Sequence, residues 1–175
     1  SKDQHGAFVP KILKDGRLPD LQDGVVAISD SSYKTPSDAA FFADLAIGQT
    51  DFSQFAKRNG FHVHFTPGEG KIGGLKNLKQ AAAPETSEEL RESALLLTRT
   101  MMQARKTKGI SWVSEGGGSG VLTQAMHMLY EQGISFEDSK HYVFFSDLTT
   151  NLVKAQTIAH KLGFKFERKI KSIDY

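Results

Sequence analysis

The amino-acid sequence predicts a three-layer α/β fold built on a mostly parallel β-sheet. Short apolar segments alternate along the chain with helical patterns of ten or more residues, as expected for parallel strands joined by crossover helices. Glycine-rich segments follow two of the expected strands. The 175 residues, 39% hydrophobic and 24% charged, suffice for one buried core, so we expect residues 1–175 to form a single α/β domain.

The first 65 residues are expected to contribute an arm, two strands and two helices. Residues 1–23 mix Gly, Pro, Asp and Lys without periodicity, which predicts an irregular N-terminal arm. Thr35 is a capping residue that precedes a proline and an early acid, a typical helix start. In chain order, we expect a strand at 25–28, a helix from 35 to 48, a second helix capped at 50–51 and ending at 59–60, and a strand at 61–65.

The remaining residues predict a further alternation of strands and helices. The segment TSEE at 86–89 has the capping-box pattern, and Leu90, Ala94, Leu97 and Met101 recur at helical spacing after it. In chain order, we expect a glycine-rich loop at 66–74, a short helix at 75–83, a helix from 86 to 106 and a strand at 110–113. A second glycine-rich loop at 114–120 is expected to lead into a helix that buries Leu122, Ala125, Met126 and Leu129. The last expected elements are a strand at 142–146, a helix from 149 or 150 to 162, and an edge strand at 164–170.

Composition and charge narrow the classes of function. A net charge of +2 is too small for a nucleic-acid footprint, and no apolar run approaches the roughly 20 residues that span a bilayer. We also expect no signal peptide. The sequence has no cysteine, which excludes disulfides and thiol catalysis and favours the cytoplasm. We therefore expect a cytoplasmic protein whose partner is a small molecule rather than nucleic acid or membrane.

The two glycine-rich loops are expected at the carboxyl ends of strands, where parallel sheets bind ligands. Glycine lets the backbone approach a ligand, and the following helix N-terminus presents N–H groups to an anion. We expect such loops to bind a phosphate or carboxylate group, although the glycines could instead serve a tight turn or close helix packing. We expect the backbone N–H groups of Gly117, Gly118, Ser119 and Gly120 to hold an anionic group of the ligand. The other predicted ligand-binding residues of the loops are Gly68, Gly70, Gly73 and Gly116.

Four segments in a fixed order carry a resemblance to a known family. They are Asp30-Ser31-Ser32, GEGKIGGL at 68–75, MQARK at 102–106 and GGSGVLTQ at 117–124. This order resembles the Gly-Ser turn, GGGxxGLMG loop, MxxRK helix end and PGGxGTxxE loop of the LOG-type, lysine-decarboxylase-like proteins of the SLOG group. Those proteins are Rossmann-like phosphoribohydrolases and nucleotide-binding relatives. The resemblance, over residues 24–162, implies a Rossmann-like fold, a homodimer and a phosphorylated, nucleotide-like ligand.

The resemblance also assigns roles to single residues. It implies that Ser31, Ser32 and Gln124 contact the ligand and that Arg105 faces its phosphate. The catalytic Glu of the family falls on Gln124, which cannot ionise, and its Thr falls on Val121. Nucleotide binding is therefore implied more strongly than hydrolysis of the N-glycosidic bond of a nucleoside monophosphate. For hydrolysis we expect Glu115 or a histidine to supply acid-base help, and we expect no cofactor.

Two other classes of function stay open. Ser114 follows the expected strand at 110–113 as in a nucleophile elbow, and Asp147 and His160 follow in the order of an α/β-hydrolase triad. The third class is a partner-binding or sensor module without chemistry. His62 and His64 share one face of their strand, where hydrogen-bonded histidines are favoured over metal ligands, so we predict no metal site.

Overall fold

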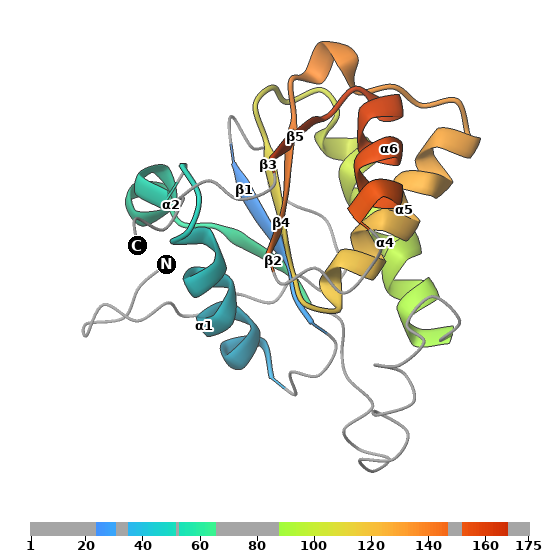
Figure 1. Cartoon of the computed structure of the whole chain (residues 1–175). Helices are drawn as coiled ribbons and strands as arrows, with labels where there is room; N and C mark the ends of the chain where they lie inside the picture. The colour runs from blue at the N-terminus through green and yellow to red at the C-terminus, as the bar shows by residue number, and fades with distance from the viewer. Residues whose placement is uncertain (1–23, 31–34, 52, 66–87, 147–151, 168–175) are drawn as a thin grey trace.

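The computed structural model describes residues 24–30, 35–51, 53–65, 88–146 and 152–167 (Figure 1). The arm predicted at 1–23 lies outside these residues. So do the glycine-rich loop predicted at 66–74 and the short helix predicted at 75–83. These three predictions therefore stay untested, whereas every other expected strand and helix falls on residues that the structure describes in whole or in part.

Within the described residues, five parallel strands form one sheet. Their bounds are β1 (Val25–Ile28), β2 (His62–His64), β3 (Ser111–Glu115), β4 (Tyr142–Ser146) and β5 (Lys165–Glu167), and they lie in the order β2-β1-β3-β4-β5. All four strand pairings are parallel, as the sequence predicts. The chain adds β2 on one side of β1 and then crosses to β3 on the other side. This reversal makes the carboxyl ends of β1 and β3 a topological switch point.

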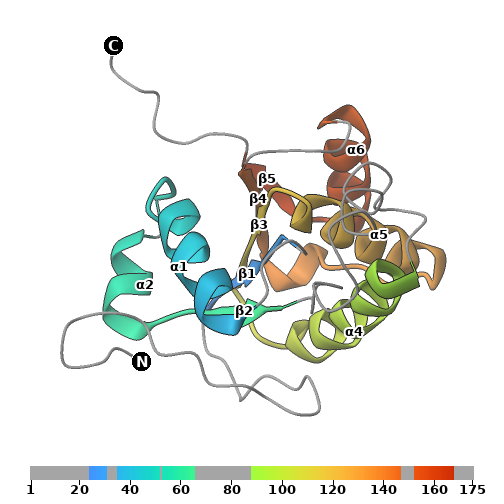
Figure 2. The ribbon, with the colours of Figure 1, turned by 90° about the horizontal axis from the view of Figure 1, so that it is seen from below.

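Helices cover both faces of the sheet, which confirms the three-layer α/β fold. Figure 2 shows α1 (Pro36–Ile47) and α2 (Ser53–Asn59) on one side of the strands. The other side carries α4 (Glu88–Ala104), α5 (Gly118–Glu131) and α6 (Leu152–Leu162). None of the helices in the described ranges is long and apolar enough to cross a membrane.

Alternate residues of the strands build two separate cores. Val26, Ile28 and Trp112 belong to the core that α4, α5 and α6 cover. Val25, Ala27 and Val113 belong to the core beneath α1 and α2. This division follows from the two-residue period of a strand, which sends successive side chains to opposite faces. The helical spacing was also predicted correctly, because all eight apolar residues assigned to buried helix faces are buried: Leu90, Ala94, Leu97, Met101, Leu122, Ala125, Met126 and Leu129.

Local signals located some element boundaries correctly and others wrongly. The Thr35 side chain accepts a hydrogen bond from the N–H of Asp38 at 3.1 Å, as expected for the N-cap of α1. Thr50, predicted to cap α2, instead donates its hydroxyl to the carbonyl of Ile47 at 2.7 Å and closes α1. The loop predicted at 114–120 is reduced to a turn, because Ser114 and Glu115 continue the pairing of β3 with its neighbours and α5 begins at Gly118.

Gly118 brings the first turn of α5 into backbone contact with β1. A Cβ atom at this position would run into the carbonyl oxygen of Ile28 and would lie 2.8 Å from the carbonyl carbon. Both are backbone atoms of a strand that is paired on both sides, so they cannot yield without disturbing the sheet. Close helix packing, the structural alternative raised by the sequence, is therefore confirmed for this glycine.

Gly118→Ala should lower the free energy of unfolding by about 3 kcal/mol, because the added methyl overpacks the contact with Ile28. Urea denaturation of the variant measures this loss. Gly48→Ala is the matched control, since its Cβ would lie 3.4 Å from the nearest carbonyl oxygens and the backbone there is right-handed helical. The control should stay within about 1 kcal/mol of the parent. Equal stabilities of the two variants would contradict the packing role of Gly118.

His141 joins three segments of the chain inside the core. The indole N–H of Trp112 donates to its Nδ1 at 3.1 Å, and its Nε2 lies 2.6 Å from the carbonyl oxygen of Thr107. Nδ1 must therefore be the unprotonated nitrogen, and Nε2 donates to Thr107. The ring is fully buried and contacts the rings of Phe136 and Phe164. Burial lowers the pKa of His141, so the folded protein holds this ring in its neutral form.

The stability of the protein should fall as the pH drops below 6.5, the ordinary pKa of histidine. Below that pH the unfolded chain binds a proton that the buried His141 ring does not accept. This proton stabilises the unfolded state and lowers the free energy of unfolding. Urea denaturation over a pH series measures the slope. His141→Asn should make the slope shallower. An unchanged slope in His141→Asn would contradict this assignment.

Candidate functional site

The candidate site lies at the carboxyl ends of β1 and β3. Ser29 and Asp30 follow β1, and Gly116 and Gly117 follow β3. The two ends are direct neighbours, because Ile28 pairs with Ser114. Open α/β sheets bind their ligands in the crevice at such a switch point. The structure thus brings one of the predicted glycine segments to the place where a ligand is expected.

The chain's own Asp30 carboxylate occupies the N-terminal end of α5. The N–H of Gly117 donates to Oδ2 of Asp30 at 2.8 Å. A Cβ atom on Gly116 would collide with the same oxygen, and Gly116 has a φ of +52°, which favours glycine. The partial positive charge at the start of a helix stabilises a carboxylate there. Asp30 therefore caps α5 from a position 87 residues away in the sequence.

Three of the N–H groups predicted to bind an anion, those of Gly117, Ser119 and Gly120, already have acceptors within the chain. Gly117 donates to Asp30, while the N–H groups of Ser119 and Gly120 donate to the carbonyls of Gly116 and Gly117 at 3.0 and 3.1 Å. The Ser119 hydroxyl also donates to the Gly116 carbonyl, at 2.8 Å. These bonds form because the turn winds directly into the first turn of α5. An external anion would therefore have to displace Asp30 to reach the Gly117 N–H.

Glu115 and Ser146 lie beside each other on neighbouring strands. Glu115 is partly buried and shares the α1 face of the sheet with Val113, because side chains alternate along β3. The Gly116 N–H donates to the carbonyl of Ser146 at 3.0 Å, and the Ser146 hydroxyl lies 3.5 Å from Oε1 of Gln49. Glu115 therefore lies at the carboxyl end of β3, as the last residue of the strand rather than in the predicted loop.

Ser114 does not have the geometry of a hydrolase nucleophile. It is the fourth residue of β3 and has 0% exposed surface, whereas a nucleophile elbow holds its serine on a turn with an exposed Oγ. Its side chain shares the α5 face of the sheet with Trp112. His160 is exposed on α6, and Asp147 lies outside the described residues. The geometry of Ser114 therefore disfavours the serine-hydrolase alternative.

Arg105 lies at the edge of the sheet opposite the glycines. Its Nε donates to the carbonyl of Ser135 at 2.7 Å, and its own carbonyl accepts from the Ser139 hydroxyl at 2.6 Å. These residues precede β3 and β4, whereas Gly117 follows β3. A five-residue strand separates the two edges by about 16 Å. Arg105 consequently cannot face a phosphate at Gly117, because α4 ends at Ala104 and the chain turns there into the start of β3.

His64 is held by α4 rather than offered to a ligand. Its Nε2 lies 3.1 Å from the carbonyl oxygen of Ser93 and 2.9 Å from the hydroxyl of the same residue. Burial lowers the pKa of His64 to about 4, and burial also lowers the pKa of His62. His64 is therefore neutral at neutral pH and hydrogen-bonded, as the sequence favoured. In the described ranges, no three His, Cys, Asp or Glu side chains are grouped so that they could hold a metal ion.

Several predicted ligand contacts remain predictions. Gln124 lies in the second turn of α5 and is partly exposed. Ser31, Ser32, Gly68, Gly70 and Gly73 lie outside the described residues. The sequence places Asp30 in the Asp30-Ser31-Ser32 segment of the resemblance but assigns it no role of its own. The one local sequence signal for its capping role is the position of this acid, two residues after the end of β1.

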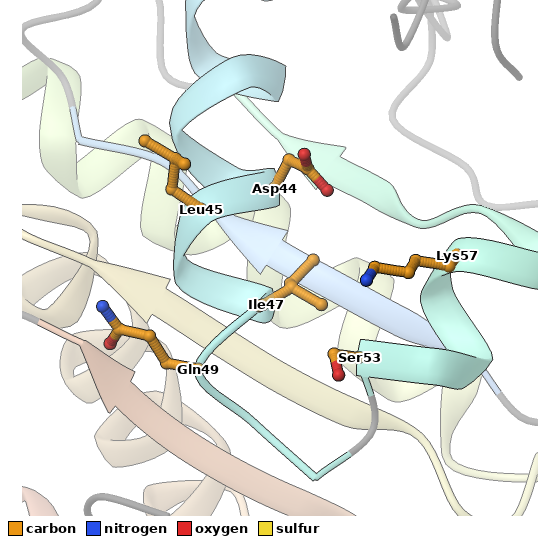
Figure 3. A pocket seen from close by; sticks show the side chains of 7 residues that line it. Asp44, Leu45, Ile47, Gln49, Ser53 and Lys57 are labelled. Carbon is orange, nitrogen blue, oxygen red and sulfur yellow. The ribbon is translucent and has the colours of Figure 1, made fainter. Parts of the chain in front are cut away.

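A pocket of about 340 Å³ lies between the end of α1 and α2 (Figure 3). Gln49, one of its lining residues, is also the neighbour of the Ser146 hydroxyl, so the pocket adjoins the carboxyl end of β4. Sequence reasoning missed this pocket because its residues have only the signals of a helix end and a turn. The pocket is lined by Asp44, Leu45, Ile47, Gly48, Gln49, Ser53 and Lys57.

Comparison of the chain with protein-family models, with curated proteins and with solved structures finds no match.

Proposed function

We propose that this chain binds a small, nucleotide-like ligand that carries phosphate at the switch point between β1 and β3. The observation that supports the proposal most is the meeting of α5 with the end of β1. Gly118 permits backbone contact there, and the Gly117 N–H already holds an anionic oxygen of Asp30. A helix N-terminus at the carboxyl edge of an open parallel sheet is a common phosphate site.

In this proposal, Asp30 takes the place of the ligand's phosphate while the site is empty. A carboxylate and a phosphate both present anionic oxygens to an N–H group, so the two compete for Gly117. The phosphate binds when Asp30 leaves the N–H, and the negative charge of Asp30 opposes its arrival. At the neighbouring strand ends, the Glu115 carboxylate would accept hydrogen bonds from the hydroxyl groups of the sugar, and the Ser146 hydroxyl would donate to them.

The same geometry supports binding more than turnover. Gln124 cannot act as a carboxylate base, and Ser114 is buried inside the fold. If the ligand is hydrolysed at its N-glycosidic bond, Glu115 is the acid that we expect to assist. The resemblance to the SLOG group supports a nucleotide as the ligand class and a homodimer as the assembly, and the lack of cysteine supports a cytoplasmic location.

Asp30→Asn should tighten the binding of a nucleoside monophosphate by about tenfold, because it removes the charge that opposes the phosphate. The asparagine side-chain oxygen can still accept from the Gly117 N–H, so the cap of α5 and the fold should persist. Isothermal titration calorimetry measures the affinity, and the unphosphorylated nucleoside should bind parent and variant equally.

The matched control is Asp138→Asn, an exposed acid in the short helix at 137–139, beside the segment that precedes β4. This variant has the same change in net charge but should bind the monophosphate like the parent. Unchanged or weaker monophosphate binding by Asp30→Asn, with its melting temperature preserved, would contradict the proposed position of the phosphate.

A further inference from the structure

The pocket between α1 and α2 presents one side chain of each charge. Asp44 comes from the last turn of α1 and Lys57 from α2, and both line the pocket. Figure 3 shows the Asp44 carboxylate and the Lys57 amine extending toward the same space beside Ile47. In the described part of the chain, no ion pair joins these two groups. The pocket therefore holds a carboxylate and an ammonium group that are separate from each other.

The rest of the lining combines apolar and polar residues. Leu45, which is 55% exposed, and Ile47 contribute apolar atoms to the lining. Ser53 and Gln49 add a hydroxyl and an amide. Such a combination, in which apolar walls surround a few polar groups, is typical of small-molecule sites. The volume of about 340 Å³ lies at the small end of the range for such sites.

We propose that this pocket binds a small zwitterion, an α-amino acid with an apolar side chain. Its ammonium group pairs with the Asp44 carboxylate, and its carboxylate pairs with the Lys57 ammonium group. Its side chain lies against Leu45 and Ile47. The carbonyl end of α1 carries a partial negative charge and favours the ammonium group further. The site is separate from the proposed nucleotide site and does not depend on it.

Charge and size favour this ligand class over the alternatives. A phosphorylated ligand would bring its two negative charges next to Asp44, and a purely cationic ligand would leave Lys57 opposed by a like charge. A zwitterion gives both protein groups an opposite partner at no net charge. An amino acid also matches a pocket of this volume, whereas a dinucleotide does not.

The first test compares three probes by isothermal titration calorimetry on the whole chain. L-leucine carries both charges, leucinamide lacks the carboxylate, and N-acetyl-leucine lacks the ammonium group. Leucine should bind, and each of the other two should bind at least about tenfold more weakly, which corresponds to about 1.4 kcal/mol. No binding of leucine, or equal binding of all three probes, would overturn the proposal.

The second test removes the protein charges one at a time. Asp44→Asn and Lys57→Met should each weaken leucine binding by at least about tenfold. Asp51→Asn and Arg58→Met are matched controls, because they change exposed charges in the same segments outside the pocket lining. The controls should bind leucine like the parent.

The charge variants also make a prediction that a damaged fold would not produce. Lys57→Met should lose the preference for leucine over leucinamide and keep the preference for leucine over N-acetyl-leucine. Asp44→Asn should show the reverse pattern. If both variants still prefer leucine over leucinamide and over N-acetyl-leucine, the two side chains do not pair with the charged groups of the ligand and the proposal is wrong.

Discussion

The close contact between the start of α5 and the end of β1 is the constraint on which the candidate site depends. Gly118 allows the helix to touch the backbone of Ile28, and this contact brings the Gly117 N–H within 2.8 Å of the Asp30 carboxylate. The positive end of α5 is thereby placed at the switch point of the sheet. A side chain at Gly118 would separate the two elements and remove both the cap and the site.

This arrangement gives the chain an internal anion at the position where an external one is expected. A carboxylate at a helix N-terminus stabilises the helix, and it also lowers the affinity of the same N–H groups for phosphate. Stability and ligand binding therefore compete for one hydrogen-bond donor. The pocket near Asp44 and Lys57 lies outside this competition, since it is built from α1 and α2, but Gln49 connects it to the end of β4.

Local features of the fold could be predicted from the sequence, whereas the site could be predicted only in part. The N-cap at Thr35 and the buried face from Leu90 to Met101 follow from spacing alone. The bond from Gly117 to Asp30 spans 87 residues and has no local periodicity to reveal it. Arg105 matches the family pattern in its place along the sequence. In the fold it lies at the edge of the sheet opposite Gly117, where its Nε donates to the carbonyl of Ser135.

The most direct test follows the amide signal of Gly117 by NMR while a nucleoside monophosphate is added. If the phosphate replaces Asp30, the Gly117 amide and the Asp30 carboxyl carbon should shift together and saturate at the same ligand concentration. The amides of the opposite edge, near Arg105, should stay unchanged. Saturable binding that leaves both Gly117 and Asp30 unshifted, or no binding at all, would contradict the account.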